Sequence, residues 1–587
     1  MLKELQRCMK ENGISAVIIP TSDPHDTEYV CEHFAARKAF SGFTGSAGTL
    51  VVLQDKAACW TDGRYYIQAQ EQLKPLSITL MKDGLKETPT ISQFLCDQLE
   101  AGDVVAYDGK VISLKQSKEY AQQFNQAGIH IRSDIDLVSQ VWTNRPLLPK
   151  SQTFMLDTRY AGASVEKKIA LVKEKMKEND ADQYLVTKVD EVAWLFNLRA
   201  HDIPNFPVAL AYARIGLNDV YLYIDQSRLD EQSKNLFQKM GITICAYEDI
   251  YEDVKGLNEN VLVDGQTINQ ALVQSIPGTI IDAISPIITL KAIKSEIEIE
   301  NTKQAHIKDG TALVRFMYWL KHTLGKETIT ECSAQDQLQA FRKEQENYIE
   351  DSFTTISAYG PHAAMMHYSA TDESDVALEK KGLYLVDSGA HYYDGTTDIT
   401  RTFVLGPLTP EQKKWFTLSL VGHIHLSQAR WLYGAKGSQL DILARSPLWQ
   451  QEMDYQCGTG HGVGHVLSVH EDNNGFRRFT NSREATLEAG MITTDEPGVY
   501  IENGFGIRHE NELLAVNDTK NEYGQFMHFE PITFVPFDKE GLELSLMSDS
   551  DIQWLNDYHQ QVFDKISPYL SDCEREWLAD ICQPIVR

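Results

Sequence analysis

Two aspartates in the segment "LVDSGAHYYDGTTDITRT" (385–402) are of the type and spacing that could bind a metal. Asp387 ends the apolar run "GLYLVD", where an unpaired carboxylate is costly to bury. Asp398 follows eleven residues later, an odd separation that places two side chains on opposite faces of one continuous strand. A hairpin that turns near Asp394-Gly395 removes this objection and brings the two carboxylates together. Taken alone, the segment is explained better by one buried, hydrogen-bonded aspartate and one turn aspartate.

The same arrangement recurs further along the chain. The segment "MITTDEPGVYIENGFGIRHENELLAV" (491–516) predicts a second hairpin, with Glu496 ending one strand and Glu510 on the next. Between the two hairpins lies "GTGHGVGHVLSVHE" (458–471), where His461 is predicted in a glycine-rich turn. Four carboxylates held close together repel one another and lose hydration, and two divalent cations would cancel their charge.

This donor set predicts a dinuclear hydrolase site. Oxygen ligands with a single imidazole suit Mn²⁺ first, with Co²⁺, Fe²⁺ or Zn²⁺ as alternatives. A pair of such metals activates water and polarises a carbonyl group. Motifs of other chemistries are missing: the sequence has no HExxH, no GxSxG and no Walker A segment, and "GTGHGVG" does not satisfy GxGxxG.

The elements that hold these residues must belong to several domains, because 587 residues are too many for one hydrophobic core. Segments 9–23 ("MKENGISAVIIPTSD") and 176–190 ("MKENDADQYLVTKVD") share a charged helix end, an asparagine and an apolar strand. This echo predicts two α/β domains of similar plan, joined by the proline-containing stretch 144–152. A chance similarity of two helix-strand units is the alternative.

The second half is predicted to open with a long helix and to continue as a sheet-rich domain. Ser295 and Glu298 have the spacing of a capping box, and an apolar face follows at helical spacing: Leu313, Phe316, Met317 and Leu320. Short strands with DG, PG and NG turns are expected from about residue 350, and the last sixty or so residues are expected to be helical. The predicted regions are 1–150, 151–290, 291–525 and a C-terminal extension, 526–587, packed on the third.

Composition limits the partners and the compartment. The 83 acidic residues exceed the 55 basic ones, and the resulting charge of −28 argues against nucleic-acid and anionic-membrane binding. The nine cysteines form no CxxC pair, and the N-terminal segment lacks the apolar core of a signal peptide. With no long apolar run, these features predict a cytoplasmic protein without disulfides.

Together, "LVDSGAHYYDGTTDITRT", "GTGHGVG", "TDEPGVY" and "GIRHEN" resemble the pita-bread metallopeptidases, the group that contains methionine aminopeptidase, prolidase, aminopeptidase P and creatinase. The resemblance spans the chain, because "TSDPHDTEYV", "FSGFTGSAGTLVV", "WTDGRYY", "WLFNLR" and "WLNDYH" are similar to segments of the large three-domain aminopeptidases P. It implies two creatinase-like N-terminal α/β domains, then a pita-bread catalytic domain (an α+β fold) with a helical tail.

The resemblance also implies roles for individual residues. It makes five side chains the ligands of two metal ions: Asp387, Asp398, His461, Glu496 and Glu510. Asp398 and Glu510 would bridge both metals. His367 and His470 match family histidines at the substrate, and Arg508 matches an arginine beside the last ligand. Cys457 departs from the pattern, since relatives commonly have a histidine there that shapes the proline pocket.

The implied activity is removal of the first residue from peptides with proline at the second position, by a hydroxide that the two metals activate. Glu496 would pass a proton to the leaving nitrogen and His470 would stabilise the intermediate. The alternatives are a prolidase, which cleaves only Xaa-Pro dipeptides with the same site, and a pita-bread module that binds without catalysis. The expected partners are peptide substrates and a second copy of the chain, as a homodimer.

Overall fold

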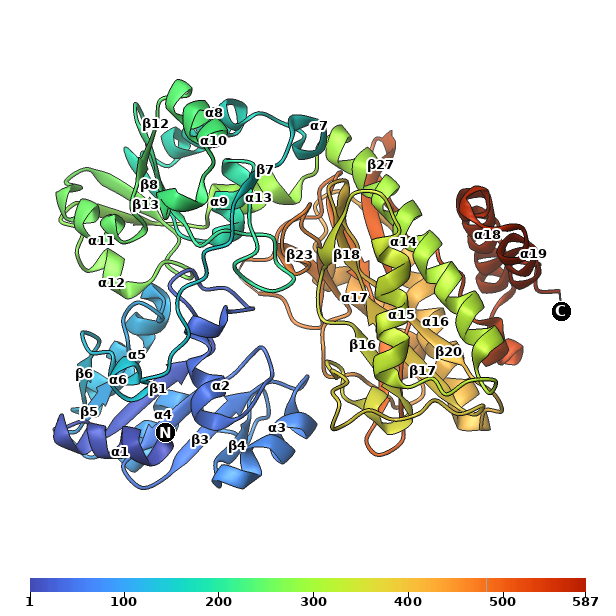
Figure 1. Cartoon of the computed structure of the whole chain (residues 1–587), viewed down its shortest axis with the longest axis horizontal. Helices are drawn as coiled ribbons and strands as arrows, with labels where there is room; N and C mark the ends of the chain where they lie inside the picture. The colour runs from blue at the N-terminus through green and yellow to red at the C-terminus, as the bar shows by residue number, and fades with distance from the viewer. Residues whose placement is uncertain (482, 587) are drawn as a thin grey trace. The chain divides into compact units, whose positions relative to one another are not determined.

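The computed structural model describes residues 1–481 and 483–586 and divides into two compact units (Figure 1). The N-terminal unit comprises residues 1–156 and 163–287, and the C-terminal unit comprises residues 157–162 and 288–587. Helix α13 (Pro286–Ala292) contains the last point at which the chain passes from one unit to the other.

The N-terminal unit contains two six-stranded sheets of the same topology. The first has the strand order β4-β3-β2-β1-β5-β6 and the second the order β12-β11-β10-β8-β13-β14. In both, the third and fourth strands pair antiparallel and the last three run parallel. The strands of the first sheet are β1 Ala16–Pro20, β2 Thr49–Leu53, β3 Ala57–Thr61, β4 Thr79–Lys82, β5 Val104–Ala106 and β6 His130–Arg132. Those of the second are β8 Gln183–Val186, β10 Tyr212–Gly216, β11 Val220–Tyr223, β12 Ile242–Cys245, β13 Asn260–Val263 and β14 Thr279–Asp282. The repeat predicted from segments 9–23 and 176–190 is therefore confirmed: they lead into β1 and β8, which occupy equivalent positions.

Helices cover these sheets, and a short two-stranded sheet, β7 (Phe154–Met155) with β9 (Leu198–Arg199), accompanies the second. The helices of the N-terminal unit are α1 Leu2–Glu11, α2 Ala36–Ser41, α3 Tyr66–Leu73, α4 Ile91–Gln98, α5 Leu114–Gln126, α6 Leu137–Val141, α8 Val165–Glu178, α9 Val189–Leu195, α10 Glu231–Lys239, α11 Ile250–Asp253 and α12 Gln270–Val273. Packing on both faces makes the central strands almost continuously apolar, as in "AVII" of β1.

The C-terminal unit is built of antiparallel strands and six longer helices, with the short α7 (Thr158–Ala161) added from the preceding segment. Its strands are β15 Tyr348–Asp351, β16 Ile356–Tyr359, β17 Leu383–Ser388, β18 Ala390–Tyr392, β19 Gly395–Thr396, β20 Ile399–Val404, β21 Arg430–Leu432, β22 Gly460–Gly462, β23 Glu471–Phe476, β24 Ile492–Asp495, β25 Gly498–Ile501, β26 Phe505–Arg508, β27 Asn511–Asn521 and β28 Gly524–Pro531. The helices are α14 Glu296–Thr323, α15 Glu331–Lys343, α16 Pro410–Ser427, α17 Gly437–Trp449, α18 Asp549–Ile566 and α19 Asp572–Ile581.

Two separate cores hold these strands against the helices. Strands β17 and β20 pack against α14 and α15, and strands β27 and β28 pack against α16 and α17. The predicted capping box is present at the start of α14, because the Ser295 hydroxyl accepts from the Glu298 amide and the Glu298 carboxylate accepts from the Ser295 amide. The predicted helical tail is also confirmed: α18 and α19 bury apolar residues in one cluster with α16.

The structure differs from the sequence prediction in three places. The sheet-rich region also contains α16 and α17. His461 lies on the short strand β22, where a glycine-rich turn was expected. The segment 491–516 is more than one hairpin: β25 and β26 form a separate two-stranded sheet, and β24 pairs directly with β27. Pro497 has no amide hydrogen to donate, which helps to end the β24 ladder after Asp495.

Two predicted absences can be examined in the described residues. All nine cysteines there are free thiols. No helix among the described residues is long and apolar enough to cross a membrane.

Candidate metal centre

The first pair of acids is carried by the predicted hairpin. Strand β17 pairs antiparallel with β20, and Asp387 lies opposite Thr400. The intervening chain folds back through β18 and β19 with its turn at Tyr393–Asp394, one residue before the predicted position. Asp398 immediately precedes β20, so the two aspartates meet at the same end of the ladder although eleven residues separate them.

The second pair of acids flanks the ends of two paired strands. Asp495 at the end of β24 lies opposite Asn511 at the start of β27. Glu496 directly follows the first strand and Glu510 directly precedes the second, so both lie just beyond the ladder. Placing Glu510 on a strand was therefore wrong by one residue, but the two glutamates are neighbours as predicted.

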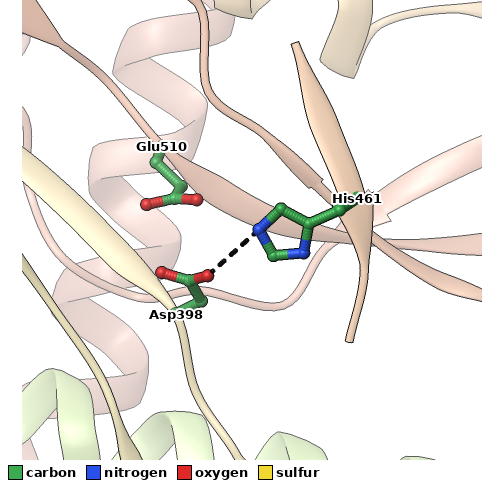
Figure 2. A group of neighbouring side chains, drawn as sticks. All are labelled: Asp398, His461 and Glu510. Atoms are coloured by element: carbon green, nitrogen blue, oxygen red, sulfur yellow. Dashed lines mark ion pairs between the residues drawn. The ribbon is translucent and has the colours of Figure 1, made fainter. Parts of the chain in front are cut away.

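Three of the predicted ligands converge closely enough to share one metal ion. Ligand atoms of Asp398, His461 and Glu510 all lie within 4.8 Å of one another (Figure 2). The His461 Nε2 atom is 3.4 Å from Asp398 Oδ2 and 3.5 Å from Glu496 Oε1. The same imidazole nitrogen therefore links Glu496 to the cluster.

The electrostatics of the centre fit a site built for cations. Burial, with the neighbouring acids, raises the pKa of Asp398 to about 6 and raises that of Glu510 well above its ordinary value. Burial opposes a charge on His461, yet Asp398 and Glu496 outweigh it and raise the His461 pKa to about 9. Without metal ions, the site thus holds protons, which supply the positive charge that bound cations would otherwise provide.

Asp387 is attached to the cluster through Arg508. Its Oδ2 atom accepts from Arg508 Nη2 at 2.5 Å, while its buried Oδ1 has no hydrogen-bond partner among the described residues. A buried carboxylate oxygen without a partner is costly unless a cation or water satisfies it. Arg508 also donates to the Tyr500 hydroxyl at 2.7 Å and lies 4.0 Å from Glu496. The observed donor set therefore fits metal ions.

The other predicted site residues lie around this centre. The ring of His470, just before β23, meets that of His461 edge to face at 4.4 Å. His367 lies half-buried in the loop after β16, and the Met366 carbonyl beside it accepts from Arg508 at 3.4 Å. Cys457 and Tyr500 are both partly buried and pack against the same apolar cluster, and the Cys457 carbonyl accepts from Arg445 at 2.7 Å.

Three histidines adjacent to the metal-binding motifs, His391, His465 and His509, are buried and hydrogen-bonded to other parts of the domain. His391 contacts the Thr396 hydroxyl at 2.9 Å, His465 contacts Thr302 at 3.1 Å, and His509 contacts the Phe416 carbonyl at 3.2 Å.

A buried ion pair behind the first hairpin was missed by the sequence reasoning. Arg342 of α15 donates to both oxygens of Asp309 in α14, at 2.7 and 3.0 Å. Asp309 also accepts from Thr397, the residue before Asp398, at 3.0 Å. Arg342 reaches Ser388, the residue after Asp387, at 3.1 Å. The pair therefore fixes the neighbours of both aspartates, and the signal in the sequence was a charged residue on the apolar face of α14.

Glu512 supports Asp398 through its backbone. The Glu512 Oε1 atom accepts from the Asp398 amide at 2.8 Å, and its Oε2 atom lies 3.1 Å from His306 Nε2. Hydrogen bonds of this kind orient metal-binding side chains and raise their affinity.

The fold and the acidic centre together define a metallopeptidase of the pita-bread class. The model of metallopeptidase family M24 matches residues 300–517, and that of its C-terminal region matches residues 525–585. Two creatinase/prolidase N-terminal domain models match residues 1–136 and 144–298.

Relatives similar over the whole length narrow this assignment. A probable Xaa-Pro aminopeptidase P of Laccaria bicolor is 38% identical over 601 residues, covering 100% of this chain and 93% of the relative. Aminopeptidase P2 of Arabidopsis thaliana is 36% identical, covering 100% and 88%. The crystal structure of X-prolyl aminopeptidase from Caenorhabditis elegans, described as a cytosolic enzyme with a di-nuclear active site, has a TM-score of 0.93 and 34% identity, covering 97% and 95%. The chain belongs to metallopeptidase family M24, in its Xaa-Pro aminopeptidase branch.

Proposed function

We propose that this chain is a metal-dependent Xaa-Pro aminopeptidase, which removes the N-terminal residue from peptides with proline at the second position. The observation that carries the proposal is the convergence of Asp398, His461 and Glu510, with Glu496 beside them and Asp387 held by Arg508. Full-length similarity to Xaa-Pro aminopeptidases supports the substrate class.

The five side chains Asp387, Asp398, His461, Glu496 and Glu510 are the proposed ligands of two divalent ions. When bound, such a pair supplies an activated water and polarises the scissile carbonyl. Mn²⁺ is the proposed ion because four carboxylates and one imidazole form a predominantly oxygen donor set. Asp398 and Glu510 would hold the ions through their carboxylates, which accords with their raised pKa values, because a bound cation would displace the proton that each carboxyl otherwise retains.

The chain's own side chains carry the remaining chemistry. Glu496 is proposed to transfer a proton to the leaving proline nitrogen, since its carboxylate is only partly buried and contacts His461. His470, whose ring packs against His461, is proposed to donate to the oxygen of the tetrahedral intermediate. His367 is proposed to line the substrate site, and Arg508 to hold Asp387 in its metal-binding rotamer.

The tripeptide Arg-Pro-Pro distinguishes this activity from that of a prolidase. Release of free arginine by the Mn²⁺-loaded protein supports the proposal, whereas hydrolysis of Arg-Pro alone identifies a dipeptidase. Glu496→Gln is the matched inactive variant, since it keeps the shape of the side chain and removes its charge. Wild-type turnover by E496Q would exclude the dinuclear mechanism. If neither protein hydrolyses either peptide, the remaining interpretation is a pita-bread module that binds without catalysis.

Cytoplasmic location and a homodimer complete the proposal. The free cysteines and the similarity to the C. elegans enzyme, which is described as cytosolic, support the first. Cys457 is proposed to alter the fit of the proline ring, because it packs against the same apolar cluster as Tyr500. Cys457→His tests this through the ratio of KM values for Arg-Pro-Pro and Arg-Ala-Pro, which differ in the residue at the second position.

A further inference from the structure

A buried network of polar side chains connects the C-terminal helix α18 to the back of the metal centre. At its centre is Arg401 of β20, which is 1% exposed and forms no ion pair with a carboxylate among the described residues. Burial lowers the pKa of Arg401. Its charge is instead balanced by oxygens: the carbonyls of Glu510 and Val535 accept from it at 2.5 and 2.7 Å, and the Tyr558 hydroxyl at 3.0 Å.

Tyr558 belongs to α18 and is 2% exposed. Its ring stacks on Trp554 one helical turn earlier, at 5.2 Å and an angle of 3°. Its hydroxyl lies 2.9 Å from the Thr533 carbonyl and 3.0 Å from the Val535 carbonyl. Trp554 and Tyr558 both belong to the motif "WLNDYH", to which the proposed mechanism gives no role.

A second branch of the network leads to the other glutamate. Arg401 has only donors, so Asn511 must present its Oδ1 atom to it, at 2.8 Å, and turn its amide nitrogen to His423 at 3.1 Å. His423 Nε2 then accepts, which leaves the proton on Nδ1. That nitrogen lies 3.0 Å from the carbonyl and 3.2 Å from the carboxylate of Asp495.

We propose that α18 is a positioning element of the metal centre, with Tyr558 acting through Arg401 and Asn511. One branch fixes the backbone of Glu510, and the other ends at the residue before Glu496. Glu496 and Glu510 lie just beyond the paired ends of β24 and β27, and the amide of each donates one hydrogen bond to a neighbouring segment, Glu496 to the Thr459 carbonyl at 2.8 Å and Glu510 to the Thr400 carbonyl at 3.2 Å. The network adds support to these two positions from a segment more than forty residues further along the chain. The identity of these ligands rests on the proposed function.

Tyr558→Phe tests the proposal because it removes one hydroxyl and preserves the stacked ring. The exposed Tyr569, in the same C-terminal region, gives the matched control Tyr569→Phe. Metal-free proteins are titrated with Mn²⁺ in a calorimeter. We expect Y558F to bind Mn²⁺ about 10–100-fold more weakly than wild type, as for other groups that orient metal ligands, and Y569F to bind normally. Because Tyr558 does not touch substrate, kcat for Arg-Pro-Pro at subsaturating Mn²⁺ falls while KM stays within twofold.

The outcomes separate this inference from the proposed function. Wild-type Mn²⁺ affinity in folded Y558F overturns the inference, even if the wild-type protein cleaves Arg-Pro-Pro. Weakened Mn²⁺ binding by Y558F in a protein without peptidase activity would refute the proposed function and support the positioning role.

A second measurement on the wild-type protein covers the case in which Y558F does not fold. Coupling between two sites is reciprocal: if α18 and its network favour Mn²⁺ binding, bound Mn²⁺ must in turn stabilise α18 and the network. We expect slower hydrogen exchange of the amides in 533–537 and 554–562 after loading, with no change in α5 of the N-terminal unit. Unchanged exchange in both segments would contradict the inference.

Discussion

The buried pair of Asp309 and Arg342 gives the sharpest test of how the first hairpin is held. Both side chains are 0% exposed and joined by two hydrogen bonds of 2.7 and 3.0 Å. Arg342→Met preserves the length of the side chain and leaves Asp309 charged, with Tyr392 and Thr397 as its remaining donors. Removing one partner of a buried ion pair costs about 3–5 kcal/mol, because the other charge remains desolvated.

That cost should appear as a lower melting temperature of the C-terminal unit. At about 2 °C per kcal/mol for a unit of this size, calorimetry of the metal-free protein should show a decrease of roughly 6–10 °C. Arg575→Met is the control, since its partner Asp572 is 85% exposed and surface pairs contribute only about 0–1 kcal/mol. If R342M and R575M melted within 2 °C of each other, the pair would not support the hairpin. Adding Asp309→Leu to R342M should recover part of the loss, because no charge then remains buried.

Three further predictions concern glycine packing and proton binding. A Cβ atom on Gly389 would lie 1.8 Å from the Thr397 carbonyl, so Gly389→Ala should displace the hairpin and abolish Mn²⁺ retention on a desalting column; retention by G389A would contradict the packing. Asp398 and His461 hold protons up to pH values of about 6 and 9, so Mn²⁺ affinity should increase from pH 6 to pH 9. Calorimetry in buffers of different ionisation enthalpy should detect the released protons, and an Mn²⁺ affinity independent of pH would disprove the prediction. Burial raises the pKa of Glu191 to about 7, so the folded N-terminal unit binds an extra proton and loses stability as the pH rises from about 4.5 to 7. Glu191→Gln should remove this loss, which urea titration of the wild-type protein should show as about 3 kcal/mol; the same pH profile of unfolding free energy for wild type and E191Q would refute the prediction.

The parts of the fold that sequence patterns predicted are those governed by local rules. The capping box of α14 depends on Ser295 and Glu298, which are three residues apart and need no distant partner. The hairpin between Asp387 and Asp398 follows from strand alternation and a turn signal within one segment. The repeated sheet was visible because both copies preserve the same order of helix end and strand.

The supporting network was not predictable, because its members meet only in the folded chain. Arg401 and Tyr558 are 157 residues apart in the sequence, and neither stands out within its own element. The separate β25–β26 hairpin was missed for a related reason. Apolar alternation continues from β24 through β27, so the pattern of residues does not reveal which strands pair.

The central claim is that five side chains bind two metal ions, and anomalous diffraction from a crystal of the Mn²⁺-loaded protein tests it most directly. We predict two manganese peaks about 3.5–4 Å apart, both adjacent to Asp398 and Glu510, with one near Asp387 and the other near His461 and Glu496. A single peak, or two peaks away from these side chains, would contradict the dinuclear centre.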